Sequence, residues 1–138
     1  MKAETKIQGI ESGRAKFAWD CAKNALEKLD KKKQKEYKSY VKKIPMYIKT
    51  NGLGATFAFM FSKKDTYSYI GNQITAWIKQ SPNQVFLEEN DKFETLVRKV
   101  IELDSPTYRA FTIEVLAFLN WLRRFAEGLI EEGESNEK

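Results

Sequence analysis

Apolar residues recur every three or four positions through almost the whole 138-residue chain. That spacing places apolar side chains along one face of an α-helix. The last such stretch shows it most clearly, through Tyr108, Phe111, Val115, Phe118, Leu122 and Phe125. No segment alternates apolar and polar residues between turn dipeptides, as half-buried strands do, and no internal repeat is visible. The pattern therefore predicts an all-α fold.

Six periodic segments follow one another and predict six helices. Their expected ranges are about 8–29, 31–50, 53–61, 67–78, 93–101 and 105–129. The segment 53–61 is apolar on nearly every side, so its pattern alone does not separate a buried helix from a buried strand. Its helical neighbours favour a buried central helix that ends at 62–64.

Three helix boundaries carry specific signals. Pro45 has no backbone N–H to donate, so we expect a kink or a break near residue 44. Asn51 and Gly52 tolerate left-handed backbone and are expected to end the second helix. Ser105 followed by Pro106 predicts the start of the last helix, with Ser105 as the N-cap and Pro106 in the first helical position.

The length of the chain is that of one domain, and 42% hydrophobic residues suffice for a packed core. We expect a single helical domain over 1–130, followed by an acidic, flexible tail over 131–138. The N-terminus lacks the apolar run of a signal peptide, and no stretch approaches the roughly 18 apolar residues of a membrane span. One cysteine, Cys21, cannot form an internal disulfide, which fits a reducing compartment. These features predict a cytoplasmic protein with no membrane partner.

Charge is distributed very unevenly along the chain. Residues 1–64 hold sixteen Lys/Arg against six Asp/Glu, whereas 65–138 hold eight against thirteen. Between Lys31 and Thr50 there are eight lysines and a single acid, Glu36. Such a basic half is typical of a protein that meets a polyanion, and nucleic acid is the first partner to consider. A solvated helix face explains the same lysines equally well, because Lys favours both helices and exposure.

The residues give little support for catalytic chemistry. The chain has no histidine, which removes the commonest general base and a common zinc ligand and leaves Cys21 without an activating partner. The acids Glu88, Glu89, Asp91 and Glu94 lie at the expected start of the fifth helix, where the helix dipole accounts for them. We therefore expect no enzyme activity, no metal and no cofactor.

Tyrosines near the basic residues admit two interpretations. Tyr37, Tyr40 and Tyr67 share the apolar helical stripes and are expected in the core. Tyr47 and Tyr69 are less constrained by the pattern. Any tyrosine that remains exposed there is able to stack on an unpaired base.

Three blocks of sequence, taken together, resemble a known family. They are 12–18 (SGRAKFA), 40–45 leading into 48–54 (YVKKIP and IKTNGLG), and 108–110 leading into Glu114, Phe118 and 121–126 (YRA and WLRRFA). In order and spacing, from about residue 12 to 126, they are similar to the small helical subunit of the type III-B CRISPR effector. That effector is the RAMP-module (Cmr) RNA-targeting complex.

The resemblance implies a small all-helical protein with no catalytic activity of its own, acting in antiviral defence. In the family, several copies stack beside a filament of RAMP subunits that holds the guide RNA. Together they form a basic surface along the duplex of guide RNA and target RNA, and the backbone subunits cleave the target. The implied partners are therefore guide RNA, target RNA, the RAMP backbone and large subunits, and further copies of the chain.

The resemblance also selects among the basic residues. Those inside the matching blocks are expected to contact RNA or other subunits, and they are Arg14, Lys42, Lys43, Lys49, Arg109 and Arg123. Lys31, Lys32 and Lys33 lie between blocks and are expected to be solvated. The alternative is a purely structural spacer that contacts protein subunits and no RNA.

Overall fold

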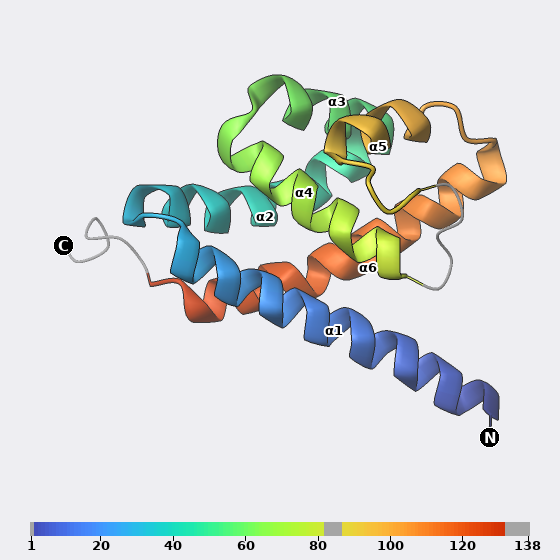
Figure 1. The fold of residues 1–138 in the computed structure, drawn as a ribbon, viewed down its shortest axis with the longest axis horizontal. Helices are drawn as coiled ribbons and strands as arrows, with labels where there is room; N and C mark the ends of the chain where they lie inside the picture. The colour runs from blue at the N-terminus through green and yellow to red at the C-terminus, as the bar shows by residue number, and fades with distance from the viewer. Residues whose placement is uncertain (1, 82–86, 132–138) are drawn as a thin grey trace.

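The computed structural model describes residues 2–81 and 87–131, with side chains from residue 9 onward. Within these residues it contains six helices and no strand, which confirms the predicted all-α fold (Figure 1). The helices are α1 (Lys2–Lys28), α2 (Lys31–Asn51), α3 (Leu53–Lys63), α4 (Asp65–Gln80), α5 (Phe93–Val100) and α6 (Ser105–Leu129). The predicted tail 131–138 lies outside the described residues except for Glu131, which is exposed. The division into a domain over 1–130 and a tail stays a prediction.

The two longest helices, α1 and α6, run side by side in the same general direction, and α3, α4 and α5 gather above them in Figure 1. The aromatic contacts follow this course along both helices. The ring centroids of Phe17 and Phe118 lie 6.1 Å apart, and those of Trp19 and Phe125 lie 5.3 Å apart. The helix α2 packs against α6 and also against α3 and α4, so it connects the pair α1 and α6 to the helices above them.

One hydrophobic core receives side chains from all six helices, as the apolar stripes require. Its centre includes the fully buried Phe57, Ile74, Leu96 and Phe118, from α3, α4, α5 and α6. The buried polar groups are paired. The Tyr37 hydroxyl donates to Gln73 Oε1 at 2.6 Å, and Gln73 Nε2 donates to the Cys21 carbonyl at 3.0 Å. This pair of bonds fixes α2, α4 and α1 relative to one another.

The helix α2 continues through Pro45 to Asn51, so of the kink or break expected near residue 44, the break is wrong. Ile44 and Ile48 are buried on the same side of the helix and hold it against the core on both sides of the proline. The predicted end at residues 51–52 is confirmed. Gly52 has a φ of +93°, and its N–H donates to the Ile48 carbonyl at 2.8 Å.

The N-cap of α6 is Asp104, so the prediction of Ser105 was wrong by one residue. The Asp104 carboxylate accepts a hydrogen bond from the Thr107 backbone N–H at 2.9 Å, and Pro106 is the second residue of the helix. A carboxylate caps as well as a hydroxyl does, and its charge also interacts favourably with the helix dipole. The acid that precedes the Ser-Pro pair therefore takes the capping position.

Replacing Asp104 with alanine is expected to lower the melting temperature at pH 7, whereas Ser105→Ala leaves it nearly unchanged. Hydrogen bonds from Thr107 lower the pKa of Asp104. A lowered folded-state pKa means that the ionised cap stabilises the folded protein at neutral pH. That contribution is lost as the pH falls through the folded-state pKa. Thermal unfolding followed by circular dichroism should therefore show a difference between the variants at pH 7 and little at about pH 2. Equal melting temperatures at pH 7 would contradict this capping assignment.

Candidate nucleic-acid interface

The lysines of α2 lie along the side of the helix that faces away from the core. Its buried residues are Tyr37, Val41, Ile44 and Ile48, and its exposed lysines include Lys31, Lys35, Lys42, Lys43 and Lys49. Two other lysines of this helix are engaged within the chain. Lys33 Nζ pairs with Asp65 at 3.2 Å, and Lys38 Nζ donates to the Ile130 carbonyl at 3.1 Å.

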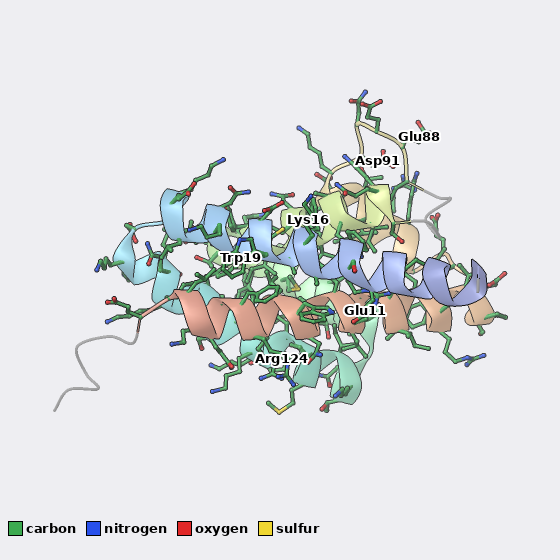
Figure 2. The ribbon with its side chains drawn as sticks, turned by 90° about the horizontal axis from the view of Figure 1, so that it is seen from below. Glu11, Lys16, Trp19, Glu88, Asp91 and Arg124 are labelled. Atoms are coloured by element: carbon green, nitrogen blue, oxygen red, sulfur yellow. The ribbon has the colours of Figure 1, made fainter. Side chains whose placement is uncertain are left out.

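The helix α6 runs antiparallel to α2 and adds arginines beside these lysines. At one end Lys38 reaches Ile130, just past α6, and at the other the Gly54 N–H donates to the Tyr108 hydroxyl at 2.8 Å. Because packed helices lie only about 8–10 Å apart, the exposed sides of the two helices adjoin. Figure 2 shows Arg124 on the side of α6 that faces away from α1.

We call this surface the α2–α6 face. It consists of Lys31, Lys35, Lys42, Lys43 and Lys49 from α2 and Arg109, Arg123 and Arg124 from α6. Arg123 pairs with Glu127 of the next helical turn at 3.5 Å. Within the described ranges, the other seven side chains of the face form no ion pair. The face therefore carries a nearly uncompensated positive charge.

Of the acids predicted at the start of α5, Glu88, Glu89 and Asp91 lie in a turn before it, at the opposite edge of the molecule, where Figure 2 labels Glu88 and Asp91. Since α5 begins at Phe93, the dipole explanation applies only to Glu94. The Asp91 carboxylate instead accepts hydrogen bonds from the Glu88 backbone N–H at 2.8 Å and from Lys99 Nζ at 3.0 Å. These bonds lower the pKa of Asp91. They give the carboxylate a structural role, so its presence here does not call for a bound metal ion.

Arg14 was predicted to contact RNA or a subunit, and its guanidinium is used inside the chain. Its Nε and Nη2 donate to the Glu114 carboxylate at 3.0 and 2.8 Å, and its Nη1 donates to Glu11 at 2.6 Å. Two indoles complete the network, because Trp77 Nε1 donates to Glu114 at 2.7 Å and Trp121 Nε1 donates to Glu11 at 2.8 Å. The hydrogen bonds to Glu114 raise the pKa of Arg14. The network ties α1 to α4 and α6.

Two charge-removing substitutions separate the buried and exposed halves of this network. The side chains of Arg14 and Glu114 are 13% and 11% exposed, whereas that of Glu11 is 52% exposed. Glu114→Gln leaves a mostly buried guanidinium without its main counter-charge and is expected to cost about 2 kcal/mol of unfolding free energy. Glu11→Gln is expected to cost less than about 1 kcal/mol, because an exposed pair contributes little. Urea unfolding measures both free energies. Equal losses in the two variants would contradict the larger contribution assigned to the buried pair of Arg14 and Glu114.

The aromatic predictions divide into confirmed and corrected residues. Tyr37 and Tyr67 are buried as expected, whereas Tyr40 is only half-buried and stacks flat on Tyr67 with ring centroids 3.9 Å apart.

The thiol of Cys21 is also buried, and burial raises its pKa to about 12. It therefore stays protonated, and unreactive as a nucleophile, at neutral pH.

Metal binding and membrane insertion find no support in the described ranges. No group of three or more His, Cys, Asp or Glu residues there is placed to hold a metal ion. None of the described helices has the combination of length and hydrophobicity needed to cross a bilayer.

Known proteins are similar to this chain in both sequence and fold. The family model described as CRISPR-associated protein (Cas_Cmr5) matches residues 10–129. A relative from Thermus thermophilus, described as CRISPR system Cmr subunit Cmr5, is 30% identical over 98 residues, which cover 70% of this chain and 77% of the relative. The crystal structure of a CRISPR-associated Cmr5 family protein from the same species superposes with a TM-score of 0.73 at 25% identity. That superposition covers 88% of this chain and 97% of the other. The chain belongs to the Cmr5 family and is a small subunit of a type III-B CRISPR Cmr complex.

Proposed function

We propose that this Cmr5 subunit is a non-catalytic, RNA-contacting component of its Cmr complex, acting in the cytoplasm in antiviral defence. In this role the α2–α6 face lies along the path of the guide RNA–target RNA duplex, while other surfaces contact further copies of the chain and the neighbouring subunits. The observation that carries the proposal is the face itself. It places eight basic side chains on two antiparallel helices, and within the described residues Glu127 is the one acid paired to it.

A face of this kind has the charge that a nucleic-acid backbone requires. Each Lys or Arg that meets a phosphate releases a condensed counterion, and this release supplies most of the sequence-independent affinity. Lys42, Lys43 and Lys49 are exposed on α2, and Arg109 is exposed on α6. We assign Arg14 a different role, that of stabilising α1 against α6, because its charge is already compensated by Glu114 and Glu11.

The non-catalytic part of the proposal rests on the chemistry that the chain offers. The sequence has no histidine, and its one cysteine is buried with a pKa of about 12. The face is built from lysine and arginine, whose side chains neutralise phosphates, and it offers neither a histidine nor a thiol. Cleavage of the bound RNA is therefore left to other subunits.

The proposal predicts a steep salt dependence for RNA binding by the assembled complex. The logarithm of the association constant should fall linearly with the logarithm of the salt concentration, by roughly 0.9 for each phosphate contact. Removing this subunit from the complex should make that slope shallower by roughly 0.9 for each phosphate contact that the subunit supplies. Filter binding of labelled target RNA between about 0.05 and 0.5 M salt measures both slopes. Identical slopes with and without the subunit would contradict direct RNA contact.

A second function, that of a protein spacer, is favoured by two exposed apolar side chains near the same face. Met46 of α2 and Ile113 of α6 are 58% and 65% exposed. An exposed large apolar side chain on each of two packed helices is a feature that a protein-binding surface would use. If this face contacts a protein, Met46→Lys together with Ile113→Lys should release the subunit from the ribonuclease-treated complex. If the face binds only RNA, the same variant should stay in that complex, because other surfaces of the subunit hold it there.

A further inference from the structure

A cleft opens between the C-terminal half of α2 and the N-terminal half of α3. It has a volume of about 520 Å³. It is lined by Tyr47, Asn51, Ala55, Thr56 and Phe59. The volume falls in the range of roughly 300–1,000 Å³ that is usual for small-molecule sites. The residues come from both sides of the turn at Gly52, so the cleft is the angle between two consecutive helices.

On each helix, the lining residues other than Thr56 belong to a row of residues spaced by four, which places them on one face of their helix. The row on α2 is Lys43, Tyr47 and Asn51, and the row on α3 is Ala55, Phe59 and Lys63. Asn51 and Ala55 are next to the turn, where the helices meet. The two rings follow in the middle, and the lysines stand farthest from the turn. The spacing thus places a polar side chain near the turn, the two rings in the middle, and one lysine beyond each ring, outside the five lining residues.

The aromatic rings are held in place by further rings behind them. The centroids of Tyr47 and Phe59 are 5.8 Å apart with the planes at 78°, and Phe59 meets Tyr67 edge-on at 5.3 Å. Tyr67 in turn stacks on Tyr40 at 3.9 Å. Phe59 is nevertheless 37% exposed, so part of its ring remains available. Lys63 Nζ lies over the same ring, 5.6 Å from its centroid, so a base would share this ring with the lysine.

The polar groups of the cleft differ in whether they are already engaged. The Thr56 hydroxyl donates to the Gly52 carbonyl at 2.8 Å and is used within the fold. Asn51 is exposed, and its side chain makes no hydrogen bond within the part of the chain that the structure describes. An asparagine amide offers a donor and an acceptor side by side, which is the pattern found on the edge of a nucleobase.

We infer that this cleft binds one unpaired nucleotide of RNA. Its base lies against the rings of Tyr47 and Phe59, its edge meets the Asn51 amide, and its phosphates lie near Lys43 and Lys63. Base–aromatic stacking of this kind is how proteins hold unpaired bases, with basic side chains tracking the backbone. The inference rests on the proposed function, since Lys43 belongs to the α2–α6 face. The two lysines favour a nucleotide over an apolar peptide segment, which would leave both of them without a counter-charge.

The test uses the isotope-labelled full chain and two probes, adenosine 5′-monophosphate and ribose 5-phosphate, which lacks the base. Resonances of Tyr47, Thr56 and Phe59 are expected to shift with the nucleotide and to saturate, and to respond far less to the sugar phosphate. Tyr47→Leu should weaken nucleotide binding about tenfold, within the range for one base–aromatic stack. Tyr69→Leu makes the same change outside the cleft and should leave binding unchanged.

Three outcomes would overturn the inference. Shifts of equal size with both probes would mean that only the phosphate is bound. Absence of shifts at the cleft residues would mean that no base enters. Unchanged nucleotide binding by Tyr47→Leu, together with its loss from the assembled complex, would show that the cleft holds a protein segment. Lys42→Glu with Lys49→Glu should weaken duplex RNA binding but leave the nucleotide shifts intact, because these lysines lie outside the cleft. The proposal for the cleft and the proposal for the α2–α6 face can therefore be contradicted independently of each other.

Discussion

Replacing Lys42, Lys43 and Lys49 together with glutamate is expected to weaken target-RNA binding by the assembled Cmr complex about 100-fold at about 0.15 M salt. The three side chains are exposed and unpaired within the described residues, so each is available for one phosphate. The loss of three contacts at roughly 0.9 counterions per contact gives this magnitude and makes the salt slope shallower by about 3. The helical circular-dichroism spectrum should not change, because none of the three packs in the core.

A matched variant separates local contact from net charge. Lys16, Lys23 and Lys92 replaced with glutamate produce the same change in charge away from the α2–α6 face, and Figure 2 shows Lys16 on the side of α1 turned away from α6. Its affinity should fall far less, since screening limits charges beyond about 10 Å. Equal losses in both variants, or no loss in either, would mean that the α2 lysines are merely solvated.

Replacing Gly71 with alanine is expected to destabilise the fold by about 3 kcal/mol, which lowers the melting temperature by roughly 10 °C. A Cβ at this position would lie 2.5 Å from two ring carbons of Phe93. That ring cannot move aside easily, because it is 3% exposed and packs edge-on against Phe57 at 5.5 Å and near Phe61 at 6.4 Å. Thermal and urea unfolding measure the loss.

The same substitution elsewhere has the opposite expected sign. Gly13 lies within α1, and an added Cβ there would meet no atom of a neighbouring helix within 4 Å, so Gly13→Ala should stabilise the helix by up to about 1 kcal/mol. Adding Phe93→Leu to Gly71→Ala should cost less than the two single changes summed, because the smaller side chain removes the clash. Additive costs would show that Gly71 is required for some reason other than its contact with Phe93.

The helices were predictable from the sequence because their signals are local. Apolar residues spaced by three or four along a helix identify its buried face, and Gly52 marks a turn through its backbone freedom alone. The same local reasoning erred where two local signals competed. Asp104 and Ser105 are both good caps, and Pro45 opposes a helix that buried packing at Ile44 and Ile48 nevertheless holds together.

The candidate site was only partly predictable, because it depends on which helices lie together. The lysine row of α2 is visible in the sequence, whereas its alignment with Arg109 and Arg123 follows from the antiparallel packing of α2 on α6. Arg14 shows the limit most clearly. Its main partner, Glu114, is 100 residues away, and no spacing rule connects the two. The cleft had a usable signal in the four-residue spacing of Tyr47 with Lys43 and of Phe59 with Lys63, but only the turn at Gly52 brings the two rows face to face.

Site-specific crosslinking tests the central claim most directly. A photoreactive amino acid is placed at position 42 of the subunit, in complexes loaded with guide RNA and labelled target RNA, and at position 16 as the control. The α2–α6 face predicts strong crosslinks from position 42 to RNA and weak ones from position 16. Crosslinks from position 42 to protein subunits alone would contradict direct contact between this face and RNA.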